Sequence, residues 1–137
     1  MIRKSVLLCC APDQAFSLFT TRVSEWWPIN HRPLKGSATK LFLEQSGRFW
    51  VRAEDGREAE LGRVLAWERP HRLALDFYAG TGINQPTALE VIFTAEGEGT
   101  RVTVHHCAKP ESEELWNQRA PVFEKSWEEV LGALATT

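Results

Sequence analysis

Residues 110–134 read PESEELWNQRAPVFEKSWEEVLGAL, and this stretch decides the fold. Its apolar residues recur at spacings of three and four, which indicates one amphipathic helix of about 24 residues with a single apolar stripe. The stripe consists of Trp116, Ala120, Phe123, Trp127, Leu131 and Leu134. Glu111, Glu113 and Glu114 fill the first turn, where negative charge complements the helix dipole. Pro121 lies inside the stretch, and we expect a kink there.

Before this helix, residues 40 to 107 have the pattern of short strands separated by turns. Turn signals such as Asp55-Gly56 and Pro70-His71 separate runs in which apolar and polar residues alternate. This pattern predicts an antiparallel meander with one apolar face. We expect that face to meet the long helix through Leu73, Leu75, Leu89, Val91, Val102 and Val104. Between residues 59 and 67 the alternation is less regular: Leu61, Leu65 and Trp67 are expected on one side, and Gly62 indicates a bulge.

The first 39 residues add a strand and short helices. Residues 2–10 are expected to form a strand, Pro12-Asp13 to begin a short helix, and residues 23–27 to form a second helical piece that Pro28 ends. Residues 28–39 are expected to form a loop. The fold class is therefore α+β. A curved antiparallel sheet of about six or seven strands wraps the C-terminal helix in a single domain, residues 1–137.

Composition excludes several classes of protein. Sixteen Lys and Arg residues against 18 Asp and Glu residues give a net charge of −2, which argues against a nucleic-acid partner. No apolar run approaches the roughly 20 residues of a membrane span, so we expect no membrane span. We expect a cytoplasmic protein whose Cys9, Cys10 and Cys107 are free thiols, because Cys9 and Cys107 would lie at opposite ends of paired strands. The unusual feature is the aromatic content, six Trp, seven Phe and one Tyr.

His106 is the polar residue of most interest. Alternation through Val102 and Val104 places it on the apolar face, either as a core histidine bonded to a backbone carbonyl or as a polar group inside a cavity. The sequence contains no nucleophile motif and no spacing typical of metal ligands, so we assign no catalytic residue, no metal and no cofactor. The Trp26-Trp27-Pro28 segment is expected to be either a plug under the short helices or a lid over a cavity.

A series of short motifs covers nearly the whole chain. They are Ala11-Pro12 with Phe16 and Phe19, Ser24-Glu25-Trp26-Trp27-Pro28 with His31, Gly47-Arg48-Phe49, Gly62-Arg63-Val64, Trp67-Glu68-Arg69-Pro70, Leu89-Glu90-Val91-Ile92-Phe93, Gly99-Thr100-Arg101-Val102 with His106, and Trp116 and Trp127. In this order they resemble the SRPBCC superfamily of START-like, helix-grip proteins, and within it the branch homologous to the activator of the Hsp-90 ATPase.

The resemblance implies a helix-grip fold and a hydrophobic cavity between the sheet and the long helix, which binds an apolar small molecule such as a lipid. The candidate cavity residues are Trp27, Phe49, Trp67, Phe77, Val91, Phe93, Val104, His106, Trp116, Phe123 and Trp127. Two other functions remain open, because one scaffold hosts several functions. One is a co-chaperone-like protein that acts through its surface on a chaperone ATPase. The other is a cyclase- or hydrolase-type enzyme that uses His106. The protein is expected to be a monomer or a homodimer.

Overall fold

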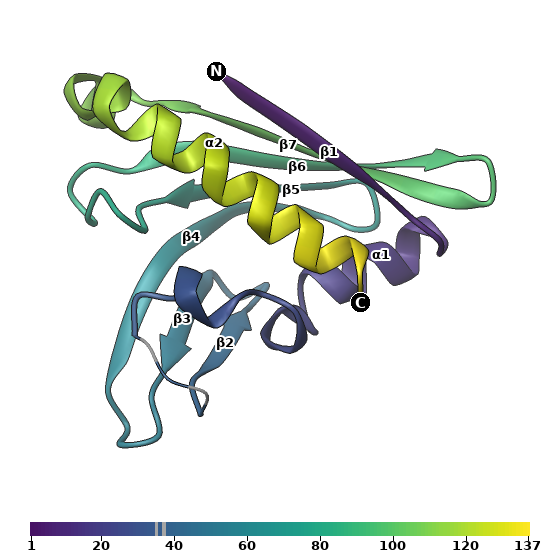
Figure 1. Ribbon diagram of the computed structural model, residues 1–137, viewed down its shortest axis with the longest axis horizontal. Helices are drawn as coiled ribbons and strands as arrows, with labels where there is room; N and C mark the ends of the chain where they lie inside the picture. Colours follow the sequence, from purple (N-terminus) through teal and green to yellow (C-terminus); the bar gives the residue numbers. More distant parts are fainter. Residues whose placement is uncertain (35, 37) are drawn as a thin grey trace.

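A seven-stranded antiparallel sheet forms the body of the molecule, with strand order β1-β7-β6-β5-β4-β3-β2 (Figure 1). The computed structural model describes residues 1–34, 36 and 38–137. Strands β2 to β7 pair in sequence order, as a meander does, and β1 joins the edge beside β7. The strands are β1 (Ile2–Leu8), β2 (Lys40–Leu43), β3 (Arg48–Arg52), β4 (Glu58–Glu68), β5 (Arg72–Phe77), β6 (Thr87–Glu96) and β7 (Gly99–Ala108).

The long C-terminal helix lies across the sheet, as Figure 1 shows in yellow. This helix, α2 (Glu113–Ala135), has 23 residues and continues through Pro121. The short helical segments are α1 (Pro12–Phe19) and the 3-10 turns η1 (Val23–Glu25), η2 (Ile29–His31) and η3 (Pro110–Ser112). The two short helical pieces after the first strand are confirmed, although the second is a single turn. The loop expected over residues 28–39 contains one further turn, η2; Lys35 and Ser37 of that loop lie outside the described residues.

Two irregularities in β4 change the direction of the sheet. The pairing of β3 with β4 steps from Phe49–Gly62 to Trp50–Glu60, so Leu61 has no partner of its own. This bulge adjoins Gly62, as the sequence indicated. A Cβ atom on Gly62 would lie 2.4 Å from the carbonyl oxygen of Asp76, so the close strand approach there leaves no room for a side chain. Bulges increase local twist and bend the strand, which is how the sheet curls around α2.

The second irregularity makes one prediction wrong. Leu65 was expected on the same side as Leu61 and Trp67, but its exposed fraction is 62%, whereas Leu61 is fully buried. The pairing of β4 with β5 steps from Val64–Leu75 to Ala66–Ala74 and leaves Leu65 unpaired. An unpaired residue resets the alternation of side chains along a strand, so the period-of-two rule fails across it.

The core lies between the concave face of the sheet and α2. All six residues expected on the inner face are buried: Leu73, Leu75, Leu89, Val91, Val102 and Val104. The register of β1 against β7 runs from Ile2–His106 to Leu8–Thr100, so Cys9 and Cys107 lie at opposite ends of that pair, and all three cysteines are free thiols.

A chain of buried hydrogen bonds joins α2 to three strands through His106, which is fully buried. The indole Nε1 of Trp127 donates to Nδ1 of His106 at 3.0 Å. An indole N–H can only donate, so Nδ1 is the acceptor and the ring proton sits on Nε2. Nε2 then donates to Oγ1 of Thr87 at 2.7 Å, and this hydroxyl donates to the carbonyl oxygen of Phe77 at 2.6 Å. The direction of every bond follows from the indole.

The surroundings of His106 keep its imidazole neutral. The rings of Phe123 and Trp116 lie with their centroids 4.6 and 5.3 Å from the imidazole. Burial among them lowers the pKa of His106 to about 3, because an imidazolium would lose its hydration without gaining a carboxylate partner. A second ring proton would also remove the acceptor that Trp127 uses.

The first prediction concerns acid stability. In the unfolded chain His106 takes up a proton near its ordinary pKa of 6.5, whereas the folded protein resists protonation down to about 3. The free energy of unfolding therefore falls as the pH falls through this window. Relative to the His106→Gln variant, the wild type should lose up to about 1.4 kcal/mol more per pH unit between about pH 6 and pH 4.

Urea unfolding followed by Trp fluorescence at several pH values measures this difference. The matched control is His71→Gln, at an exposed histidine, which should leave the slope of the wild type unchanged. Parallel pH profiles for the wild type and His106→Gln would contradict the prediction.

Candidate functional site

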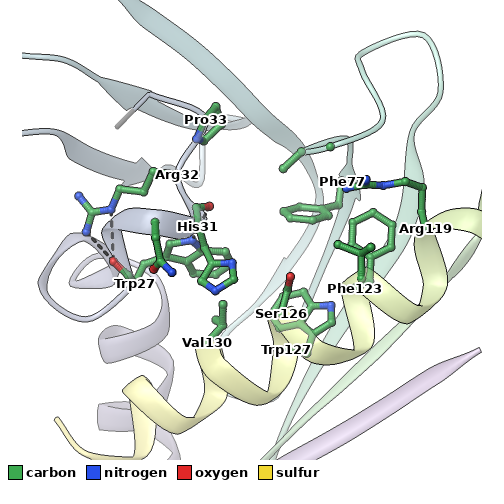
Figure 2. A pocket seen from close by; sticks show the side chains of 14 residues that line it. Trp27, His31, Arg32, Pro33, Phe77, Arg119, Phe123, Ser126, Trp127 and Val130 are labelled. Atoms are coloured by element: carbon green, nitrogen blue, oxygen red, sulfur yellow. Dashed lines mark hydrogen bonds between the residues drawn. The ribbon is translucent and has the colours of Figure 1, made fainter. Parts of the chain in front are cut away.

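A pocket of about 400 Å³ opens between α2 and the segment that runs from Trp27 to Pro33 (Figure 2). Its volume falls in the range of roughly 300–1,000 Å³ that is typical of small-molecule sites. Three parts of the chain line it: residues 27–33, the end of β5 with the turn after it, and one face of α2. The lining residues are Trp27, Asn30, His31, Arg32, Pro33, Phe77, Ala79, Gly80, Arg119, Val122, Phe123, Ser126, Trp127 and Val130.

Aromatic rings form the floor of the pocket and hold one another in place. Trp27 meets Trp127 edge to face at 5.9 Å between ring centroids, and Phe49 supports Trp27 from behind at 5.4 Å. Phe77 lies 6.0 Å from Trp127 and 6.5 Å from Phe123. Tilted and edge-to-face pairs of this kind add a modest stabilisation to the burial of the rings. The floor is therefore built before any ligand arrives.

The structure brings four of the sequence-based candidates together at this pocket: Trp27, Phe77, Phe123 and Trp127. The other candidates belong to the packed core behind it or to its edges, and they are Phe49, Trp67, Val91, Phe93, Val104, His106 and Trp116. Trp67 and Phe93, for example, pack against Phe16 of α1 at 5.3 and 5.1 Å.

The structure shows where His106 and the two neighbouring tryptophans lie. The ring nitrogens of His106 bond to the side chains of Thr87 and Trp127, and His106 is not among the residues that line the pocket. Trp26 and Trp27 are both buried. Trp26 donates to the carbonyl oxygen of Leu18 at 2.7 Å and fills the space beside α1, whereas Trp27 is part of the aromatic floor of the pocket.

Arg32, which the sequence analysis did not single out, holds the segment that carries Trp27. Its guanidinium is buried and donates to backbone carbonyl oxygens, those of Trp27 at 2.7 and 3.2 Å, Ser24 at 2.8 Å and Thr39 at 2.8 Å, and to the hydroxyl of Thr39 at 3.4 Å. Desolvation lowers the pKa of Arg32 from its ordinary value, but a guanidinium stays charged at neutral pH. One side chain thus fixes three points of the loop.

A second contact joins this segment to the long helix. Nε2 of His31, at the end of η2, lies 2.5 Å from Oε2 of Glu129 on α2. The Nε1 atom of Trp27 donates to the carbonyl oxygen of His31 at 3.2 Å. His31 therefore connects Trp27 with α2, which forms the opposite side of the pocket.

Arg119 occupies the other end of the pocket. Its guanidinium carbon lies 5.3 Å from the centroid of the Phe123 ring, and Figure 2 shows the side chain extending from α2 toward Phe77. Gly80, with φ of +84°, passes so close that a Cβ there would lie 2.5 Å from Nη2 of Arg119. A side chain at position 80 would have to displace the guanidinium. Neither residue stands out in the sequence, because the contact joins a turn and a helix that are far apart in the chain.

Within residues 1–34, 36 and 38–137, no group of three or more His, Cys, Asp and Glu side chains is arranged to hold a metal ion. In the same part of the chain, no helix combines the length and the apolar character needed to cross a membrane.

The second prediction tests the role of Arg32. Replacing it by Met keeps most of the volume but leaves the carbonyls of Ser24, Trp27 and Thr39 without their donor. The Arg32→Met variant should lose about 1–3 kcal/mol of stability, and the amides of residues 24–33 should exchange faster with solvent. The control is Arg57→Met, at an exposed arginine in a turn, which should be close to neutral. Equal stabilities of the two variants would show that the carbonyl contacts of Arg32 contribute nothing.

Comparison with known proteins agrees with this architecture. Residues 10–137 match the model of the family described as "Activator of Hsp90 ATPase homolog 1-like protein". A search of curated proteins found no match.

Several solved structures share the fold. CalC from Micromonospora echinospora, described as a self-sacrificing resistance protein, is 23% identical with a TM-score of 0.74, over 98% of this chain and 91% of CalC. Txn09, described as an anthrahydroquino-gamma-pyrone synthase, is 27% identical with a TM-score of 0.63, over 98% of this chain and 94% of Txn09. DynU16, a protein of the dynemicin biosynthetic locus, is 19% identical with a TM-score of 0.64. That match covers 98% of this chain and 45% of DynU16, so the chain spans less than half of it.

The sheet curled around a C-terminal helix confirms the helix-grip fold that the motifs implied. The family match extends over nearly all of the same elements, from residue 10 to the last residue of α2 and beyond it. On these grounds the chain belongs to the family of Activator of Hsp90 ATPase homolog 1-like proteins, within the SRPBCC superfamily.

Proposed function

We propose that the protein binds a small, largely apolar molecule in the pocket between α2 and residues 27–33. One observation carries this proposal: the rings of Trp27, Phe77, Phe123 and Trp127 surround a space of about 400 Å³ that the chain does not fill. Apolar space of this size, with a few polar groups around it, is the usual form of a ligand site.

The pocket is held open by contacts that do not need a ligand. Hydrogen bonds from Arg32 fix the backbone that carries Trp27, and the bond to His106 fixes the indole of Trp127. A ligand that enters such a site spends little free energy on ordering the protein, because the walls are already in place. His106 thus acts as a positioning residue behind the pocket wall.

Chemistry of the cyclase type is the second candidate, because the 27% identical Txn09 is described as a synthase. In this chain Thr87 and Trp127 engage both ring nitrogens of His106, which argues against its use as a base. The imidazole that lines the pocket is that of His31, whose Nε2 contacts Glu129. Mass spectrometry of a candidate ligand after incubation separates the two functions, since binding returns the molecule unchanged and catalysis does not.

An action through the surface on a chaperone ATPase has weaker support. Among the described residues, the exposed large apolar side chains include Leu7 on β1, Leu65 on β4 and Ile83 in the turn after β5. These positions are on separate elements, and single exposed apolar residues are normal on protein surfaces.

The third prediction tests binding directly. Nile red, a neutral apolar dye, should bind one-to-one and saturably, with a rise in dye emission and a change in Trp fluorescence because Trp27 and Trp127 are in the wall. Ser126 lies on the pocket face of α2, so the Ser126→Phe variant should fill the space and weaken binding about tenfold or more.

The matched control is Gln118→Phe, which places the same ring on an exposed position of the same helix. It should bind the dye as the wild type does. The proposal fails if the wild type shows no saturable binding, or if both Phe variants bind equally well.

A further inference from the structure

The charge of the pocket differs from that of the whole chain. The protein carries 18 Asp and Glu residues against 16 Lys and Arg residues, yet the described residues that line the pocket include two arginines and a histidine but no carboxylate. Glu129, which is not a lining residue, contacts His31 and has a half-exposed side chain. The described lining residues therefore carry no negative charge that would repel an anion inside the pocket.

The two arginines differ in their hydrogen bonding. The N–H groups of Arg32 that face the loop bond to carbonyl oxygens of that loop. Arg119 makes no hydrogen bond and no ion pair with any described residue, and its Nε atom is buried without a partner. Many arginines of this chain do pair with carboxylates, namely Arg22, Arg48, Arg57, Arg63, Arg69, Arg72 and Arg101.

The position of the unpaired guanidinium is restricted. Phe123 lies under it and the backbone of Gly80 passes beside Nη2, so the group is held at one end of the pocket. A guanidinium presents its N–H donors as a planar fork that matches the two oxygens of a carboxylate. The Nε–H itself is buried, so a carboxylate in the pocket would pair with the N–H groups of the two terminal nitrogens, which have no acceptor among the described residues.

From these observations we propose that the pocket selects an apolar carboxylic acid. The carboxylate pairs with Arg119, and the apolar body lies against Trp27, Phe77 and Trp127. This inference rests on the proposed binding function and adds the chemical class of the ligand. It involves no covalent step. The ring floor supplies the apolar contact, and Arg119 supplies the discrimination between an acid and a neutral molecule of the same shape.

An isosteric pair of probes tests the proposal. 2-Naphthoic acid and 2-naphthamide have nearly the same shape, but only the acid is an anion at neutral pH. The wild type should bind the acid about tenfold more tightly than the amide, as a charge-assisted fork contact predicts. In the Arg119→Gln variant the preference should be lost, so that the ratio of the acid affinity to the amide affinity falls from about ten to about one.

Arg52→Gln is the matched control, because Arg52 also stacks on aromatic rings, those of Phe42 and Trp50, outside the lining of the pocket. It should keep the preference for the acid. In the wild type, the NMR signal of the Arg119 Nε–H should shift on addition of the acid and not of the amide. This second measurement does not depend on whether the Arg119→Gln variant folds.

The possible failures are distinct. Equal binding of acid and amide by the wild type, or an acid preference that survives in Arg119→Gln, overturns the assignment of Arg119 and leaves the binding function intact. If neither probe nor Nile red binds the wild type saturably, the binding function itself is wrong. A shift of the Arg119 signal with both probes would show that the guanidinium senses ring contact and not charge.

Discussion

The neutral imidazole of His106 is the constraint on which the geometry of the interior depends. It accepts the hydrogen bond of the Trp127 indole, and it donates to a hydroxyl that in turn donates to the backbone of β5. Helix packing by apolar contact alone permits small sliding and rotation, but a directional hydrogen bond between buried groups does not. The chain of bonds therefore fixes the rotation of α2 against the sheet, and with it the positions of Trp127 and Phe123.

The pocket exists because the aromatic side chains divide into two sets. One set packs closely in the core, where Phe16, Phe19 and Phe93 join α1 to the sheet. The rings of the other set, which include Trp27, Phe77, Phe123 and Trp127, meet at similar angles with their centroids 5.9–6.5 Å apart, and these rings line the pocket.

Arg32 and Arg119 show how environment separates chemically identical groups. Backbone carbonyls surround Arg32, so its N–H groups hold the loop in place. A ring and a glycine adjoin Arg119, which lines the pocket without a hydrogen-bond partner among the described residues. The same charge therefore organises the site at one end and is available for recognition at the other.

The sequence by itself determined the element order, the single layer of sheet and the face of α2 that is buried, because periods of two and of three to four report local backbone geometry. It failed at Leu65, where an unpaired residue resets the alternation. Alternation placed Phe77 on the inner face of the sheet, and the three-to-four period placed Phe123 and Trp127 on the buried stripe of α2. Neither pattern distinguishes a ring in the core from a ring that lines a pocket, and neither indicates that Arg119 lies beside Gly80. Only the tertiary structure decides these two points, because they depend on which distant segments meet and on how much space remains between them.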